Sequence, residues 1–126
     1  MKEALRDGGQ EYDVAVVPDG AVALDYLCQH GAYDRARVPD LIFLDLNLPK
    51  KSGSEVLGQI KKDERLRFIP VVIFSSSAAP QDVTQAYQLH ANCYVTKPAD
   101  VDELFNTIRL IERFWLKAVT LPASRG

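Results

Sequence analysis

The 126-residue sequence is long enough for one domain with a hydrophobic core and too short for two. Its formal net charge of −2 argues against nucleic-acid binding, because a surface that binds phosphates needs an excess of Lys and Arg. No apolar run is long enough to span a membrane. With two cysteines far apart and no secretory segment, the expectation is a cytoplasmic protein with free thiols.

The first third of the chain predicts a helix end, a strand and a second helix. Residues 1–9 are typical of the last turns of a helix that stops at a Gly-Gly pair. The apolar run Tyr12–Val17 predicts a strand, and Asp19 is a suitable N-cap for the helix that follows. Four residues of that helix are expected on its inner face: Ala21, Leu24, Leu27 and Cys28.

The rest of the chain predicts three more strands, each followed by a helix. The expected strands span residues 40–46, 71–75 and 93–97. Ser52 or Ser54 is expected to start the helix after the first of them, and Asp100 the long last helix. Pro80 is expected to start the helix between the strands at 71–75 and 93–97, because proline suits a first helical turn.

Alternating strands and helices predict a parallel sheet with helices on both faces, because parallel strands need crossover connections. The continuous apolar runs Leu41–Leu44 and Val71–Phe74 support this, since such strands are buried on both faces. The expected fold class is therefore α/β, a doubly wound parallel sheet. Residues 1–121 are expected to form the domain and residues 122–126 a frayed tail.

Three of the predicted strands end in a polar residue: Asp45, Ser75 and Lys97. Ligands of open α/β sheets bind outside the carboxyl ends of the strands, so these side chains are expected in one crevice. The set suits transfer of a phosphoryl group to the Asp45 carboxylate, with Lys97 and a divalent metal neutralising the phosphoryl oxygens. A single Asp after a strand is more often a turn or cap residue. The conjunction at three strand ends favours the phosphoryl site.

The segments that carry these residues resemble the receiver domains of two-component response regulators. The similar segments are LDLNLPKKSG around Asp45, VVIFS ending in Ser75, and YVTKP containing Lys97. Their spacing is similar to that of chemotaxis-type receivers, and the resemblance extends from the first residue to about Leu121. LNLPKKSG together with FWLKAVTLP looks most like single-domain regulators that partner bacterial phytochromes. The resemblance implies a flavodoxin-like sheet of strand order 2-1-3-4-5.

The resemblance also implies a role for each matching residue. Asp45 is expected to be the phosphoacceptor, Lys97 to contact the phosphoryl group and Ser75 to be the switch hydroxyl. Tyr94 is expected to change rotamer when Ser75 moves. Ser76 is small, which would leave the phosphoryl site accessible.

The loop after Asp45 is expected to complete a Mg²⁺ site, again by resemblance. The backbone carbonyl of Asn47 would be a metal ligand beside Asp45, and Pro49 and Gly53 would shape the loop. Lys97–Pro98 would be a cis peptide bond, which for X–Pro costs only about 0.5–1 kcal/mol.

One feature of receivers is missing from these 126 residues. Receivers begin with an apolar strand that ends in two adjacent acidic residues, which hold Mg²⁺, and no such pair follows an apolar run in residues 1–40. Counted back from Asp45, the pair would fall before Met1. The expectation is an N-terminally truncated receiver that lacks its central first strand. Without that strand, the two neighbouring strands would have unpaired backbone edges, so we expect marginal stability, a strand supplied by another chain, or direct closure of the gap between them. Without the acidic pair, we expect weak Mg²⁺ affinity and slow phosphorylation.

The signal is expected to leave through protein contacts, because no output domain follows residue 126. By resemblance, the responsive face consists of the fourth helix, the fifth strand and the last helix, and the phosphoryl donor is a sensor histidine kinase of the phytochrome type. Leu110 and Phe114 form an apolar ridge that fits a homodimer or a partner, or else packs under the tail. The core stripe of the last helix is expected at Val101, Leu104, Ile108, Ile111 and Trp115.

The main hypothesis is a phosphoacceptor, which is not an enzyme acting on an outside substrate. Three other functions are alternatives to it. A degenerate receiver that binds proteins independently of phosphorylation would explain the missing acidic pair. An aspartate-nucleophile phosphohydrolase would need a carboxylate where Asn47 stands. A flavin-binding protein would need a phosphate loop rich in Ser, Thr and Gly after a strand.

Overall fold

The computed structural model describes residues 16–35, 38–46 and 52–122. These fall into two compact units. The larger unit contains Val17–Thr96 and includes a parallel sheet, and the smaller unit contains Lys97–Leu121 with the last helix. No helix in the described ranges is long and apolar enough to cross a lipid bilayer.

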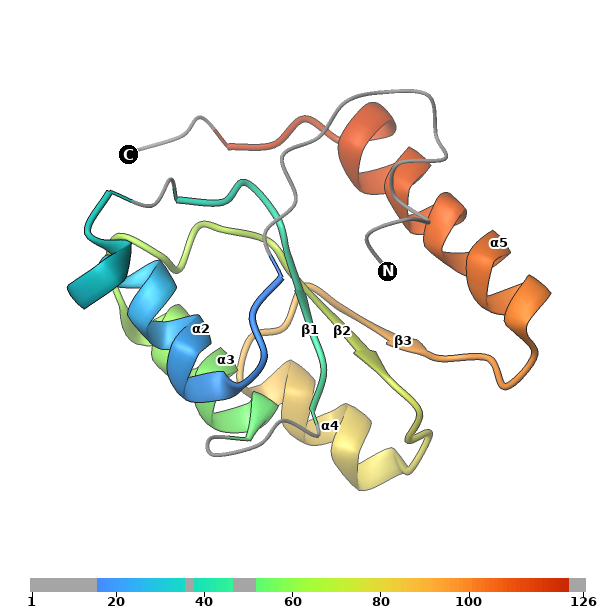
Figure 1. Ribbon diagram of the computed structural model, residues 1–126. Helices are drawn as coiled ribbons and strands as arrows, with labels where there is room; N and C mark the ends of the chain where they lie inside the picture. The colour runs from blue at the N-terminus through green and yellow to red at the C-terminus, as the bar shows by residue number, and fades with distance from the viewer. Residues whose placement is uncertain (1–15, 36–37, 47–51, 123–126) are drawn as a thin grey trace. The chain divides into compact units, whose positions relative to one another are not determined.

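Three parallel strands form the sheet of the larger unit (Figure 1). They are β1 (Ile42–Leu44), β2 (Val71–Ser75) and β3 (Cys93–Thr96), in the order β1-β2-β3. The register pairs Leu44 with Ile73 and Ser75 with Thr96. Since the strands are parallel, their carboxyl ends meet at one edge of the sheet, where the sequence places its polar residues. The parallel α/β fold class predicted from the sequence is confirmed.

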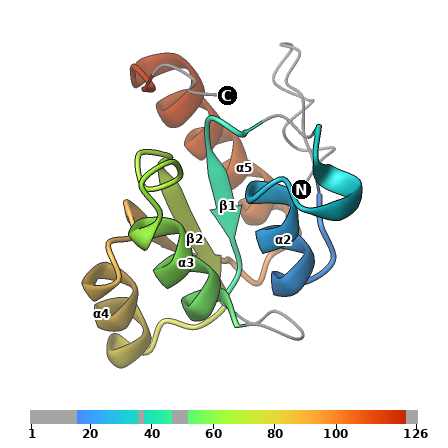
Figure 2. The ribbon, with the colours of Figure 1, turned by 90° about the vertical axis from the view of Figure 1, so that its left-hand side faces the viewer.

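Helices of the larger unit lie beside this sheet. They are α2 (Gly20–Leu27), α3 (Gly53–Lys62) and α4 (Pro80–Gln88), with a short 3₁₀-helix η1 (Gly31–Tyr33) after α2. Figure 2 shows α3 between α2 and α4, in line with the contacts of α3 to both neighbours. This layer is the one expected for crossover helices between parallel strands.

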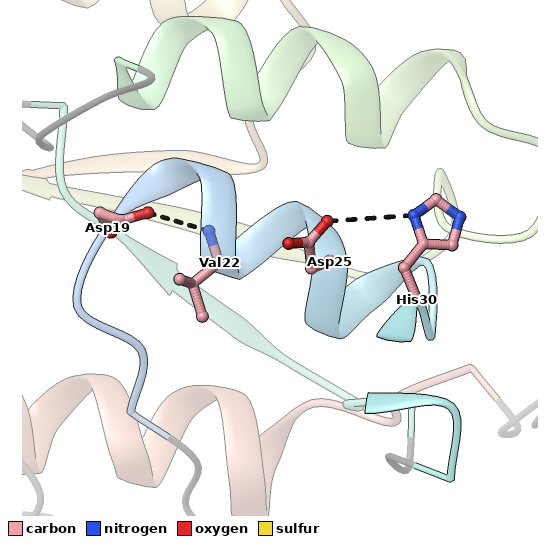
Figure 3. Close-up of polar contacts among 4 residues, drawn as sticks. All are labelled: Asp19, Val22, Asp25 and His30. Atoms are coloured by element: carbon pink, nitrogen blue, oxygen red, sulfur yellow. Dashed lines mark hydrogen bonds and ion pairs between the residues drawn. The ribbon is translucent and has the colours of Figure 1, made fainter. Parts of the chain in front are cut away.

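Side-chain caps fix where two of these helices begin. Asp19 Oδ1 accepts a hydrogen bond from Val22 N at 2.9 Å (Figure 3), and Ser52 Oγ accepts one from Glu55 N at 3.2 Å. Ser52, rather than Ser54, is therefore the cap of α3. His30 Nδ1 lies 3.9 Å from Asp25 Oδ1, a pair that Figure 3 marks with a dashed line. Both side chains are largely exposed, so this pair adds little stability.

The core of the larger unit lies between the sheet and its helices. Val56, Leu57 and Ile60 of α3 are almost completely buried, as their spacing predicts. They pack in one cluster with Val71 and Ile73 of β2. Alternate residues of β2, Val72 and Phe74, are equally buried and point to the opposite face. Burial on both faces explains why the strand VVIFS is apolar almost throughout.

Lys61 anchors the opposite, amino edge of the sheet. Its Nζ donates hydrogen bonds to the carbonyl oxygens of Arg67 (3.1 Å) and Ile69 (2.9 Å) and to Asn92 Oδ1 (3.0 Å). The same Asn92 oxygen accepts a bond from Val71 N at 2.8 Å. Burial lowers the pKa of the Lys61 ammonium, since the charged form loses contact with water. The anchor joins the end of α3 to the starts of β2 and β3.

The smaller unit is dominated by α5 (Val101–Glu112), which continues as a π-helix, η2 (Arg113–Ala118). Asp100 caps α5 as predicted, with its Oδ2 accepting from Glu103 N at 3.0 Å. Ile108 and Ile111 are buried. Val101 is 62% exposed, so its place in the core stripe is a wrong prediction. It stands at the first position of the helix, before the buried stretch begins.

Other boundaries differ from those expected. The predicted strand over 12–17 falls mostly outside the described residues, and Val17 is not in a strand. β1 is shorter than 40–46. The helix that starts at Pro80 is expected from the sequence to run to His90, but α4 ends at Gln88, because His90 adopts a left-handed φ of 71°. The Lys97–Pro98 bond is trans, so the cis prediction is wrong. The trans form is the one that X–Pro bonds intrinsically favour.

Candidate functional site

Asp45 lies directly after β1 and is half-buried. The start of α3 holds the backbone beside it, because Gly53 N donates a hydrogen bond to the Leu46 carbonyl oxygen at 3.0 Å. A Cβ atom on Gly53 would lie only 2.6 Å from Leu46 Cα and would also overlap the Asp45 carbonyl oxygen. Only glycine permits this close approach, as expected for a residue that shapes the loop. Asn47 and Pro49 are outside the described residues.

Ser75 is the last residue of β2 and is completely buried. β1 and β2 are neighbours in the sheet. Asp45 follows the end of β1 and Ser75 ends β2, so both residues lie at the same edge of the sheet. Ser75 Oγ accepts a hydrogen bond from Ser77 N at 3.2 Å. A serine hydroxyl can accept and donate at once. The Ser77 amide therefore leaves the hydroxyl proton of Ser75 for an acceptor such as a phosphoryl oxygen.

The loop between β2 and α4 is held by a second serine. Ser77 Oγ donates to Asp82 Oδ2 at 2.6 Å and accepts from Ala79 N at 3.3 Å. Asp82 lies in the first turn of α4, where a negative charge is favoured. Ser76 is exposed, beside the buried Ser75. Sequence reasoning missed Ser77 and Asp82, because the N-cap of α4 is Ala79, whose side chain makes no capping hydrogen bond and gives no signal at the start of the helix.

Tyr94 links β3 to this loop and to α4. Its hydroxyl donates to the Ser77 carbonyl oxygen at 2.8 Å, and its backbone N donates to the Tyr87 hydroxyl at 3.2 Å. Tyr94 is thus one residue away from Ser75 in a hydrogen-bond network, as an aromatic that responds to Ser75 would need to be. Tyr87 was not predicted as part of the site, because no motif in the sequence of α4 indicates a contact with Tyr94.

Lys97 is the first residue after β3 and is half-buried. It belongs to the smaller unit, whereas Asp45, Ser75 and the residues around Ser77 belong to the larger one. Within the described ranges, no group of three or more His, Cys, Asp or Glu is placed to hold a metal ion. The Asp45 carboxylate does offer the oxygen ligand that Mg²⁺ prefers, and such sites often use one or two carboxylates together with water.

Comparisons with known proteins agree with this fold. The family model for the response regulator receiver domain matches residues 1–109. Response regulator Rcp1 of Synechocystis sp. is 44% identical over 124 residues, which cover 98% of this chain and 84% of that protein. The match spans the β-strands and helices that carry the candidate site.

Solved structures give the same result. The phosphorylated cyanobacterial phytochrome response regulator RcpA is 49% identical, with a TM-score of 0.94, and the match covers 97% of this chain and 87% of that one. The Mn²⁺-bound form of response regulator Rcp1 is 44% identical, with a TM-score of 0.93 and coverage of 97% and 88%. The chain therefore belongs to the family of response regulator receiver domains of two-component systems.

Proposed function

We propose that the chain is a phosphoacceptor response regulator of a His-Asp phosphorelay, phosphorylated on Asp45 and signalling through protein contacts. Residues 1–121 would form the receiver and 122–126 its tail. The observation that best supports this function is the pairing of a carboxylate and a hydroxyl at the ends of adjacent parallel strands. The Asp45 carboxylate is the nucleophile of the pair, and the Ser75 proton is left to donate.

In the proposed reaction, an Asp45 carboxylate oxygen attacks the phosphorus of a phosphohistidine on a sensor histidine kinase. A P–O bond to Asp45 forms while the P–N bond to the histidine breaks, and the imidazole nitrogen keeps the electron pair. Lys97 would contact the transferred group and offset its negative charge. Ser76, which is small and exposed, would leave the path to Asp45 open.

Mg²⁺ fits the Asp45 carboxylate, with the Asn47 carbonyl as a further ligand carried over from the resemblance. When bound, the ion would supply positive charge that neutralises the phosphoryl oxygens. The Mn²⁺-bound form of Rcp1 is consistent with a divalent ion in relatives of this chain. Among the residues that the structure describes, no group of three or more His, Cys, Asp or Glu is placed to hold a metal ion, so we expect weak binding.

After transfer, Ser75 would donate its hydrogen bond to a phosphoryl oxygen, and Tyr94 would respond through Ser77. The partner that phosphorylates the chain would be a phytochrome-type histidine kinase, given that RcpA is described as a phytochrome response regulator. Leu110 and Phe114, which are 68% and 55% exposed, are the proposed contact for a homodimer or a downstream protein.

Intact mass after incubation with Mg²⁺ and a small phosphodonor tests this function. We expect one phosphoryl adduct in the wild type and none in Asp45→Asn, which keeps the size of the side chain but is not a nucleophile. Ser75→Ala should still form the adduct, since it leaves Asp45 in place. An adduct that persists in Asp45→Asn would show that another residue is modified.

A phosphorylation-independent binding module is the second candidate. The observation that favours it is that, in the described part of the chain, no group of three or more His, Cys, Asp or Glu is placed to hold a metal ion. Absence of any adduct in the wild type, together with equal partner binding by wild type and Asp45→Asn, would support this function over the phosphoacceptor.

A further inference from the structure

A continuous series of hydrogen bonds leads from the buried Ser75 to the surface of α4. Ser77 N donates to Ser75 Oγ at 3.2 Å, and the Ser77 carbonyl oxygen accepts from the Tyr94 hydroxyl at 2.8 Å. Tyr94 N in turn donates to the Tyr87 hydroxyl at 3.2 Å. Ser75 is 0% exposed and Tyr87 is 48% exposed, so the series crosses from the core to solvent.

The last of these bonds joins a strand backbone to a helix side chain. β3 is an edge strand of the described sheet, and the N–H of Tyr94 points to α4 instead of to β2. Because this bond is exposed, water can replace it, and its net contribution to stability is small. Its main effect is geometric: it fixes the last turn of α4 against the backbone of the residue whose side chain contacts Ser77.

The first turn of α4 is attached differently. Asp82 Oδ2 accepts from Ser77 Oγ at 2.6 Å, so this end of the helix is tied to the loop that follows Ser75. If Ser75 moves to donate its hydroxyl proton to a phosphoryl oxygen, Ser77 would move with it, because Ser75 Oγ is the acceptor of the Ser77 amide. The two ends of α4 are therefore attached to different elements. The first turn is bonded through Asp82 to the loop after β2, and the last turn is bonded through Tyr87 to β3.

From this arrangement we infer that Tyr87 is a positioning residue of the switch, the fixed point about which α4 turns when Ser75 changes its hydrogen bonds. The inference rests on the proposed phosphorylation of Asp45. The Asp82 end of α4 follows Ser77, while the Tyr87 end stays with β3. The signal then reaches the surface as a rotation of α4 and not as a shift of the whole helix.

Amide hydrogen exchange of Tyr94, followed by ¹H–¹⁵N NMR on the full chain, tests the anchor without phosphorylation. Tyr87→Phe removes the acceptor and keeps the ring, so exchange at residue 94 should accelerate about 3- to 10-fold, as expected for one lost hydrogen bond. Tyr94→Phe is the matched control: it cuts the contact with Ser77 but keeps the backbone bond to Tyr87. Unchanged exchange at residue 94 in Tyr87→Phe would overturn the anchor.

A second measurement follows the amides of α4 before and after phosphodonor and Mg²⁺ are added, with intact mass on the same samples. In the wild type, shift changes should be large near Asp82 and small near Tyr87. In Tyr87→Phe, with an equal adduct, they should extend along the whole helix. The same pattern in both proteins would overturn the inference. A wild type without adduct would instead overturn the proposed function, and the exchange experiment would still decide whether Tyr87 is an anchor.

Discussion

Gly53 has no room for a side chain beside Asp45. Its missing side chain lets the first turn of α3 lie against the backbone of Asp45 and Leu46. Gly53→Ala should destabilise the fold by about 1–3 kcal/mol, because the added methyl group meets backbone atoms that have no room to move. Urea unfolding measures this, and adduct formation on Asp45 should slow in parallel.

Gly58 provides the control for that substitution. It lies in the same helix, but a Cβ atom there would be 3.9 Å from Leu89 Cδ2, an ordinary contact. Gly58→Ala should therefore stabilise the chain by about 0.5–1 kcal/mol, as alanine does within helices. Equal stability of Gly53→Ala and wild type would contradict the close approach described at Asp45.

At the scale of elements, Lys61 connects α3 with the starts of two strands. Lys61→Met removes three hydrogen bonds while keeping most of the apolar stem, so it should lower the free energy of unfolding by about 1–3 kcal/mol. Lys62→Met, at the exposed neighbouring position, should change it by less than about 0.5 kcal/mol. Similar urea midpoints for the two variants would mean that the anchor carries no net stability.

The ridge on α5 gives a second prediction at this scale. Leu110→Glu combined with Phe114→Glu should shift a dimer to monomer in sedimentation velocity, because charges replace the exposed apolar contact. Arg113→Glu is the control, since it also changes the net charge by −2 (one positive lost, one negative gained) but leaves both ridge residues intact. If the double variant sediments like the wild type, the ridge is not the dimer contact.

Elements with local signals were predicted well, and contacts between elements were not. The cap Ser52, the buried face of α3 and the strand at 71–75 follow from periodicity and from turn chemistry within a few residues. The Lys61–Asn92 and Tyr87–Tyr94 hydrogen bonds join separate segments of the chain, and no residue pattern predicts which polar groups of separate segments form hydrogen bonds. The place of Ser75 at the end of its strand could be predicted, because the apolar run before it marks where the strand ends.

For the whole molecule, a weakly held ion should have little effect on stability. Ligand binding stabilises a fold by RT ln(1 + [L]/Kd), which is about 0.4 kcal/mol when the Mg²⁺ concentration equals Kd. We therefore expect millimolar Mg²⁺ to leave the urea midpoint almost unchanged, while EDTA abolishes adduct formation. A large Mg²⁺-dependent rise in the midpoint would show a tighter site than the Asp45 carboxylate explains. The marginal stability expected from the sequence stays a prediction for the same unfolding curves.

The double acceptor Asn92 bears on how the protein ages. An exposed asparagine is open to slow deamidation, which converts its side-chain amide to a carboxylate. Here the oxygen that accepts from Lys61 Nζ and Val71 N would be kept, and the new negative charge would lie beside a lysine ammonium. The aspartate product of deamidation would therefore keep both hydrogen bonds, whereas the isoaspartate product, which adds a methylene group to the backbone, would break them. Asn92→Asp, unfolded in urea beside the wild type, should be at least as stable; a clear loss of stability would show that the amide nitrogen matters too.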